Sequence, residues 1–351
     1  MSGQLNGGYD VVIVGGGAAG LNGALVLARS RRSVVVIDAG NPRNAPAAGV
    51  HGLLGRDGTP PAELLERGRA EVRGYGGHVV SGEVSAVTPD GDGFEVALAD
   101  GRTVRARRLL VAAGLVDELP DIPGLLDRWG RDVVHCPYCH GWEVRDRAVG
   151  VLATGPLSVH QALLFRQLSD DVTVFPNTRP LAGEEAERLA ARGIPVVAGA
   201  VARVEVAGDR LIGVRISDGT LVRREVLAVS SRLAAQAGFL AGLGLKPAEH
   251  PAGVGDYIPA DPMGCTDVAG VWVAGNVTDL MAQVGGAAAE GALAAAHINA
   301  DLVLEETNRA VAAYQRVNEG RAPAHLADGS TSRAGGGQHV VAHGRHSGFV
   351  G

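Results

Sequence analysis

The sequence predicts an α/β protein that contains two parallel-sheet units in one chain. In the stretch from Tyr9 to Gly40, a buried strand, a glycine-rich turn, a helix and a second buried strand follow one another. Residues 148–177 repeat that order, and both stretches contain the continuous Val/Ile runs typical of buried parallel strands. The length of 351 residues also exceeds one ordinary core. Together these observations predict two Rossmann-like, three-layer domains.

Further elements are predicted by local signals between and around these units. We expect Thr59 to cap a helix that begins with Pro60 and Pro61, because proline suits the first helical turn. Short strands are expected from 77 to 111, with a hairpin turn at Asp100-Gly101. Residues 270–306 predict a buried strand, a loop and a long Ala-rich helix.

The composition limits the partners and the location of the protein. The net charge of −6 indicates no nucleic-acid partner. The first ten residues contain no basic side chain and no signal-peptide pattern, so we expect a cytoplasmic protein. The uncharged run from Val11 to Ala28 contains five glycines, which fit a glycine-rich turn better than a membrane span. We therefore expect no membrane partner.

The glycine-rich turn of the first unit is a candidate dinucleotide cradle. Gly15, Gly17 and Gly20 form GxGxxG directly after the first strand. In this context, Gly15 permits the tight turn, Gly17 lets the backbone approach a pyrophosphate, and Gly20 lets the helix pack on the strand. The helix N-terminus offers free N–H groups to phosphate. Asp38 ends the second strand, where a carboxylate can accept hydrogen bonds from a ribose.

The segment His135 to Val144, HCPYCHGWEV, contains two cysteines two residues apart with a histidine on each outer side. A zinc site, a structural disulfide and a reactive redox pair are the alternatives. Zinc needs four ligands, and the sequence shows no second cluster near this one, so we expect no metal. In a cytoplasmic protein, a close pair that binds no metal is more often catalytic than structural. The sequence therefore favours a redox pair of Cys136 and Cys139.

Three motifs together resemble the low-molecular-weight thioredoxin reductase family. They are VAAG at 111–114, the CxxC pair, and GVWVAGN at 270–276, which looks like the second FAD motif of such flavoproteins. The resemblance runs from about Tyr9 to Asp301. It implies a split FAD-binding domain, 1–117 and 245–318, into which a pyridine-nucleotide-like domain, 118–244, is inserted with the CxxC. Residues 319–351 would form a flexible Gly/His-rich tail, whose histidines we expect to be solvated rather than metal-binding.

The resemblance also implies which residues hold FAD. Asn276 stands where the family usually has an aspartate that faces the ribityl chain, and an amide can still make that hydrogen bond. Gln283 and Val284 begin the helix whose positive end would face the flavin, and His51 falls near a loop that contacts the ring. The complete set expected at the cofactor is Gly15, Gly17, Ala18, Ala19, Gly20, Asp38, Arg43, His51, Val84, Ala113, Gly114, Gly275, Asn276, Gln283 and Val284.

By the same resemblance, Cys139 is the flavin-proximal sulfur and Cys136 the sulfur that meets the substrate. The family usually has an aspartate after the second cysteine, but this chain has His140, and His135 precedes the pair. A histidine can accept a thiol proton near neutral pH, which favours taking protons from an incoming dithiol. The alternative is that either histidine only caps the helix or faces solvent.

The second unit departs from a nucleotide site where the phosphates would lie. The first glycine of the expected motif is Ala153, its closing alanine is Ser158, and Pro156 lacks an N–H for phosphate. After the next strand the family has His-Arg-Arg, but residues 175–178 are Phe-Pro-Asn-Thr. The second unit is therefore expected to have lost the ability to bind NADPH, unless Arg179 replaces one of the missing arginines.

An FAD protein with a CxxC pair and no hydride donor can oxidise dithiols instead. The pattern looks like the thioredoxin-reductase-like dithiol oxidases that form disulfides in small natural products such as gliotoxin and holomycin. The resemblance implies a small-molecule dithiol substrate, O₂ as the acceptor that yields H₂O₂, and a homodimer. The alternatives are a disulfide reductase driven by NADPH or ferredoxin, and a non-enzymatic redox sensor.

Overall fold

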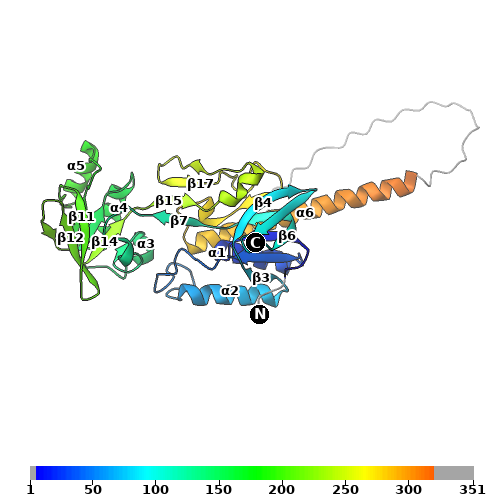
Figure 1. Ribbon diagram of the computed structural model, residues 1–351, viewed down its shortest axis with the longest axis horizontal. Coiled ribbons are helices and arrows are strands. Elements are labelled where there is room, and N and C mark those ends of the chain that lie inside the picture. The colour runs from blue at the N-terminus through cyan, green and yellow to red at the C-terminus, as the bar shows by residue number, and fades with distance from the viewer. Residues whose placement is uncertain (1–4, 320–351) are drawn as a thin grey trace, which may run out of the picture. The chain divides into compact units, whose positions relative to one another are not determined.

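The computed structural model describes residues 5–319. Its first sheet has seven strands in the order β3-β2-β1-β6-β5-β4, and β18 also pairs with β6. Figure 1 labels β3, β4 and β6 of this sheet. The strands β3, β2, β1, β6 and β18 are parallel, whereas the β4–β5–β6 meander is antiparallel. The strands are β1 (Gly8–Val14), β2 (Val34–Asp38), β3 (His78–Ser81), β4 (Val84–Asp90), β5 (Gly93–Leu98), β6 (Thr103–Val111) and β18 (Val271–Val273).

The strand β1 shows how this sheet is buried on both faces. Val11 and Ile13 pack into one apolar cluster together with residues of the helices α1 (Ala18–Arg29), α2 (Pro61–Gly74) and α6 (Val284–Glu319). Val12 and Val14 point the other way, into a cluster with β4, β5 and the 3₁₀ helix η2 (Gly238–Leu243). Because side chains alternate along a strand, a continuous Val/Ile run buries both faces. The result is a three-layer arrangement.

The helix α2 does not begin as the sequence predicted. Its N-cap is Pro60, and no side chain caps the helix. Thr59 instead belongs to the preceding loop, where its carbonyl accepts a hydrogen bond from the Val50 N–H at 2.8 Å. The prediction that Thr59 caps the helix is therefore wrong, because a contact with a residue nine positions away holds this threonine outside the helix. The hairpin turn at Asp100-Gly101 is confirmed, with Gly101 at φ 87°.

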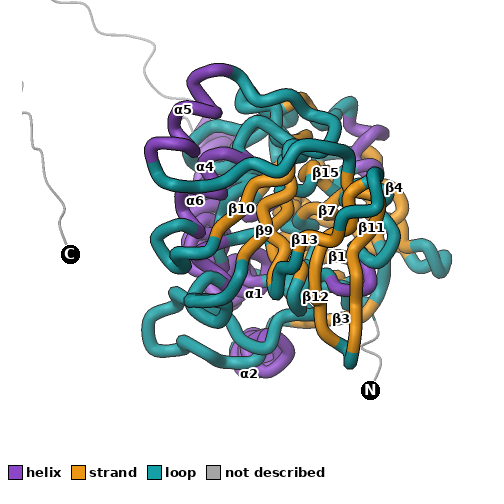
Figure 2. The backbone as a smooth tube through the Cα atoms, turned by 90° about the vertical axis from the view of Figure 1, so that its left-hand side faces the viewer, coloured by secondary structure: helices purple, strands orange, loops and turns teal. Residues whose placement is uncertain are grey.

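The inserted unit also has a parallel sheet that is covered on both faces, but this sheet is smaller. Four parallel strands lie in the order β10-β9-β14-β8, and they are β8 (Val133–Val134), β9 (Val149–Leu152), β10 (Val172–Phe175) and β14 (Val226–Val229). The helices α4 (Ser158–Phe165) and α5 (Gly183–Ala191) contribute to the apolar cluster on one face. On the other face lies a small sheet of β11 (Val201–Ala207), β12 (Arg210–Ile216) and β13 (Leu221–Val222). Figure 2 shows β11 and β12 running side by side.

Two antiparallel strands connect the units. The chain leaves the first sheet through β7 (Leu115–Glu118) and returns through β15 (Arg232–Ala235), and these strands pair with each other. The short strands β16 (Ala248–Glu249) and β17 (Gly255–Tyr257) complete that small sheet. The architecture is therefore α/β, with a second Rossmann-like unit inserted in the first.

Two expectations concern the ends and the surface of the chain. No helix within residues 5–319 is both long enough and apolar enough to cross a membrane. The tail histidines His339, His343 and His346, for which the sequence analysis weighed metal binding, lie outside the described residues. Short 3₁₀ helices, η1 (Leu126–Arg128) and η3 (Gly275–Val277), complete the elements, together with α3 (Pro137–His140), which carries the cysteine pair.

Candidate active site

A cavity of about 740 Å³ lies where the carboxyl ends of β1, β2 and β6 meet α3 and the start of α6. Thirteen of the fifteen predicted cofactor residues line it, as do all four predicted catalytic residues. The lining members of the predicted set are Gly15, Gly17, Ala18, Ala19, Asp38, Arg43, Val84, Ala113, Gly114, Gly275, Asn276, Gln283, Val284, His135, Cys136, Cys139 and His140. The tertiary structure thus brings the glycine-rich turn and the CxxC segment to one hollow.

A side chain is excluded at Gly15 and Gly20 by backbone atoms, whereas at Gly17 it would meet no protein atom. Gly15 has φ 105°, and a Cβ there would lie 2.2 Å from the Ala112 carbonyl oxygen. A Cβ on Gly20 would lie 1.9 Å from the carbonyl oxygen of Gly15, so Gly20, which does not line the cavity, lets α1 approach the turn. A Cβ on Gly17 would meet no protein atom within 4 Å and would only fill the cavity. The N-terminus of α1 has no side-chain cap, and Gly17, Ala18 and Ala19 at this end line the hollow, where a pyrophosphate could accept hydrogen bonds from free N–H groups.

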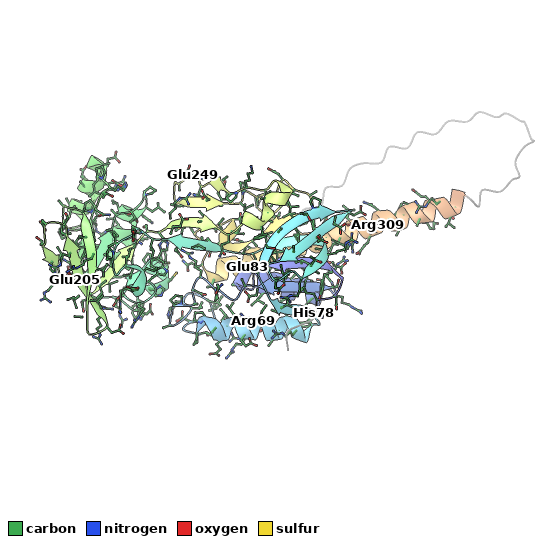
Figure 3. All side chains as sticks on the ribbon, in the orientation of Figure 1. Arg69, His78, Glu83, Glu205, Glu249 and Arg309 are labelled. Atoms are coloured by element: carbon green, nitrogen blue, oxygen red, sulfur yellow. The ribbon has the colours of Figure 1, made fainter. Side chains whose placement is uncertain are left out.

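Asp38 stands at the end of β2 beside the turn. Its Oδ1 accepts the Gly40 N–H at 3.0 Å, and its Oδ2 pairs with the guanidinium of Arg69 at 3.1 Å. Arg69, which Figure 3 labels on α2, was missed by the sequence analysis, because nothing in the local pattern of α2 marks that arginine. The Asp38 side chain is 16% exposed, so the carboxylate stays within reach of a ribose hydroxyl while its charge is balanced.

Asn276 has a structural role that an aspartate could not fill. Its Nδ2 donates to the carbonyl oxygens of Asp279 and Ala282, both at 2.9 Å, and so holds the loop that leads into α6. A carboxylate has no donor for these carbonyls. Nearby, the Gly275 N–H donates to Glu290 Oε2 at 2.7 Å, and burial raises the pKa of Glu290. These bonds of Asn276 and Glu290 therefore hold η3, whose residues Gly275 and Asn276 line the cavity.

The cysteine pair lies at the start of α3. Cys136 is the N-cap, Pro137 follows it in the first turn, and the Cys139 N–H bonds back to the Cys136 carbonyl. The two Sγ atoms are 2.6 Å apart, so a disulfide between them needs little movement. A hydrogen bond from the Cys139 thiol lowers the pKa of Cys136 to about 7 against the opposing effect of burial, and Arg43 adds to the lowering. The partner pKa, that of Cys139, is raised because its proton is held in this hydrogen bond and the thiol is buried.

The two flanking histidines are kept neutral by their surroundings. His135 Nδ1 donates to the Val229 carbonyl at 3.1 Å, which leaves Nε2 as the proton acceptor of the ring. Burial and then the charge of Arg43 lower the pKa of His135. Burial also lowers the pKa of His140, whose Nε2 is buried without a hydrogen-bond partner among residues 5–319. Neutral imidazoles beside thiols can act as bases at neutral pH.

The positive charge of Arg43 acts to lower the pKa of Cys136, Cys139 and His135, although larger effects raise the pKa of Cys139. It makes two hydrogen bonds to the Asp117 carboxylate, at 2.7 and 2.8 Å, and Ser231 Oγ donates to the same carboxylate at 2.6 Å. Asp117 lies on β7, and Ser231 directly precedes β15, so this cluster ties the two connecting strands to the loop of Arg43. Neither Asp117 nor Ser231 was predicted, because each is recognised only from partners far away in the sequence.

His51 is the other predicted cofactor residue that does not line the cavity. Its ring lies between Asp57 and Glu143, with both N–O separations at 3.4 Å. Leu53 and Gly52 of the same loop lie near Gly285 and Gln283 at the start of α6. The structure therefore places His51 beside the cysteine segment.

Comparisons with known proteins place the chain in a family. The sequence pattern of the pyridine nucleotide-disulphide oxidoreductases matches residues 9–291. The chain belongs to this family. It is 35% identical over 304 residues to the thioredoxin reductase tcpT of Claviceps purpurea, covering 81% of this chain and 91% of the relative.

Two solved structures extend the similarity to the fold. The crystal structure of HlmI has a TM-score of 0.84 and 46% identity, and covers 90% of this chain and 99% of its own. The oxidoreductase from Agrobacterium tumefaciens has a TM-score of 0.78 and 34% identity, and the match covers 84% of this chain and 99% of the neighbour. Membership of the family makes the protein an oxidoreductase.

The second glycine turn is where a pyridine nucleotide would be expected in this family. Here the N–H groups of Thr154 and Gly155 both donate to Ser158 Oγ at 3.1 Å, and Pro156 has no N–H. Arg179, the one candidate to replace the lost arginines, pairs with Glu185 Oε1 at 2.7 Å. Asn177 Oδ1 accepts the Val201 N–H at 2.8 Å. Two N–H groups of the turn and one side-chain atom each of Arg179 and Asn177 are therefore bonded to the protein itself, although α4, like α1, has no side-chain cap.

Proposed function

We propose that the protein is an FAD-dependent dithiol oxidase that forms a disulfide in a small-molecule dithiol and uses O₂ as acceptor, giving H₂O₂. One contrast supports this most strongly. The uncapped N-terminus of α1 lines the cavity, whereas in the second turn the N–H groups of Thr154 and Gly155 are bonded to Ser158 Oγ and Pro156 has no N–H. The cysteine pair is the other route by which this chain's own residues can bring electrons to the cavity.

The lining residues of the cavity support FAD as the cofactor. The open α1 N-terminus suits a pyrophosphate, Asp38 suits a ribose, and Gly17 leaves the space that a Cβ would fill. Asn276 Oδ1 stays an acceptor for a hydroxyl group, because its Nδ2 is bound to the loop carbonyls. When bound, FAD supplies a two-electron acceptor that O₂ can reoxidise.

The chain's own residues carry the thiol exchange. A substrate thiolate attacks Cys136 Sγ of the Cys136–Cys139 disulfide, forms a mixed disulfide, and releases Cys139. The second substrate thiol then attacks the substrate sulfur of that mixed disulfide and releases Cys136, so two electrons pass from the dithiol to the pair. Cys136, with a pKa lowered to about 7, is a good leaving group. His135 and His140 accept the substrate protons.

The substrate is expected to be small, and the protein a homodimer. The two sulfurs lie in a cavity rather than on an open surface, and both cysteines are partly buried. This favours a small dithiol over a folded protein partner. The homodimer is inferred from the resemblance to the family.

The alternative is a disulfide reductase driven by NADPH or ferredoxin. It is supported by the name thioredoxin reductase, which several relatives carry. In that direction, electrons would leave through Cys136 to a protein disulfide. The two functions differ in which reagent reduces the flavin, so one experiment separates them.

The test is an anaerobic titration of the purified yellow protein, with flavin absorbance as the readout. Dithiothreitol, used as the model dithiol, is expected to bleach the flavin, and admitted air is expected to restore the colour with one H₂O₂ per dithiol oxidised. NADPH is expected to leave the absorbance unchanged over the same period. Rapid bleaching by NADPH, or failure of the dithiol to bleach, would contradict the oxidase and support the reductase.

A further inference from the structure

The buried side chain of Gln161 connects α4 to the segment that carries the cysteine pair. Gln161 is 5% exposed and does not line the cavity. Its Nε2 donates to the His135 carbonyl at 2.5 Å, and its Oε1 accepts a hydrogen bond from Ser230 Oγ at 3.2 Å. Because a carbonyl oxygen can only accept, the His135 contact fixes which way the amide is turned. Both ends of this buried amide are therefore bonded.

His135 is held at two points. Gln161 holds its carbonyl, and its ring Nδ1 donates to the Val229 carbonyl at 3.1 Å. The His135 carbonyl and the Cys136 N–H belong to one planar peptide group. A rotation of that group would change the backbone of Cys136 and move its Sγ relative to that of Cys139, which lies 2.6 Å away. The bond from Gln161 therefore acts on a candidate base and on a reacting sulfur together.

Ser230 directly follows β14 and links Gln161 to the second glycine turn. The Ser230 hydroxyl donates to Gln161, and the Ser230 carbonyl accepts a hydrogen bond from the hydroxyl of Thr154 in that turn. The neighbouring residue Val229 is the one that accepts from the His135 ring. The turn, α4 and the end of β14 thus form one hydrogen-bonded support for the cysteine segment.

We propose that Gln161 is a positioning residue of the redox centre, which holds the His135–Cys136 peptide group so that both side chains line the cavity. The inference rests on the proposed dithiol oxidation, in which Cys136 reacts with the substrate and His135 accepts a proton. Gln161 acts through His135 and touches no reacting atom. In this way α4, which follows the turn where a nucleotide would be expected, contributes to the thiol chemistry.

The alternative is that Gln161 only stabilises the packing of α4, and Ser158 provides the control for it. Ser158 lies on the same helix, is 0% exposed, and its Oγ accepts the N–H groups of Thr154 and Gly155, both at 3.1 Å. These bonds lie in the second turn and not in the cysteine segment. Loss of either side chain should lower stability, but only loss of Gln161 should change the thiols.

The test compares Gln161→Met, which keeps the length of the side chain and removes both hydrogen bonds, with Ser158→Ala. In each full-length, FAD-loaded protein, alkylation of the reduced Cys136 by iodoacetamide is followed against pH. The midpoint should rise in Gln161→Met toward that of an ordinary thiol, because the hydrogen bond from Cys139 that lowers the Cys136 pKa is loosened. Anaerobic flavin reduction by dithiothreitol should slow roughly 10- to 100-fold. Ser158→Ala should match the wild type in both, while the urea midpoints of both variants fall.

A second variant keeps the test decisive if Gln161→Met does not fold. Gln161→Glu keeps the acceptor for Ser230, but it can donate to the His135 carbonyl only while its carboxyl is protonated. Burial raises the pKa of such a carboxyl. Its rate of flavin reduction, relative to the wild type at the same pH, should therefore fall as the pH is raised from 5 to 10.

The outcomes separate this role from packing and from the oxidase itself. An unchanged alkylation midpoint in Gln161→Met, or an equal shift in Ser158→Ala, would refute the positioning role. Agreement of Gln161→Glu with the wild type at every pH would refute it as well. Failure of dithiothreitol to reduce the wild-type flavin would contradict the oxidase, and the alkylation comparison would still decide the role of Gln161.

Discussion

Two glycines of the first turn allow a matched test of the cradle. Gly20→Ala and Gly17→Ala each add one methyl group three residues apart, but the structure assigns them opposite effects. The Gly20 Cβ would lie 1.9 Å from the Gly15 carbonyl oxygen, a backbone atom that cannot turn away. We therefore expect Gly20→Ala to destabilise the protein by about 3 kcal/mol, the upper end for overpacking.

Gly17→Ala should instead affect cofactor binding. No protein atom lies within 4 Å of the new Cβ, and Gly17 has φ −80°, which alanine tolerates. The expected stability loss is about 0.5–1 kcal/mol, because alanine is a poorer N-cap than glycine. The methyl group occupies the space beside the α1 N-terminus, where loss of one charged hydrogen bond costs ~1.5–3 kcal/mol. The Kd for FAD should therefore rise about 10- to 150-fold.

The assay uses apoprotein, so that bound FAD does not change the stability that is measured. Urea unfolding followed by circular dichroism gives the stability of each variant, and quenching of FAD fluorescence gives its affinity. Wild-type affinity in Gly17→Ala would refute the assignment of that space to the cofactor. Wild-type stability in Gly20→Ala would show that the helix and the turn are not in the contact described.

Three further outcomes are expected. Cys136→Ser should abolish dithiol oxidation while the protein stays yellow, and persistent H₂O₂ production would remove Cys136 from the mechanism. In the reduced protein, alkylation of Cys136 by iodoacetamide should rise with pH through a midpoint near the lowered pKa of about 7, since the thiolate exists above that pH; a midpoint near 9 would contradict the hydrogen-bonded pair. Arg128→Ala leaves the Asp132 carboxylate, 9% exposed, without its partner, and should lower the urea unfolding free energy by about 3–5 kcal/mol. The exposed pair Arg188–Glu184 is the control, and Arg188→Ala should change the unfolding free energy by less than about 1 kcal/mol. Equal losses of unfolding free energy in Arg128→Ala and Arg188→Ala would refute the burial argument.

Local patterns in the sequence were enough to predict the fold class and the parts of the site. The α/β class follows from continuous Val/Ile runs, and the glycine spacing predicts the turn, because backbone clashes at Gly15 and Gly20 arise within a few residues or between adjacent strands. The helix start at Thr59 was predicted wrongly. Proline and threonine signal a helix N-terminus locally, but the pairing of Thr59 with Val50 competes with that signal.

The tertiary structure decided which side chains act on one another. Arg43 meets Asp117 across 74 residues, Asp117 meets Ser231 across 114, and His51 meets Glu143 across 92, so no periodicity or spacing could indicate these pairs. Short-range sterics and alternation depend on neighbouring residues and can be read from the sequence. Charges and hydrogen bonds between distant segments exist only once packing brings those segments together.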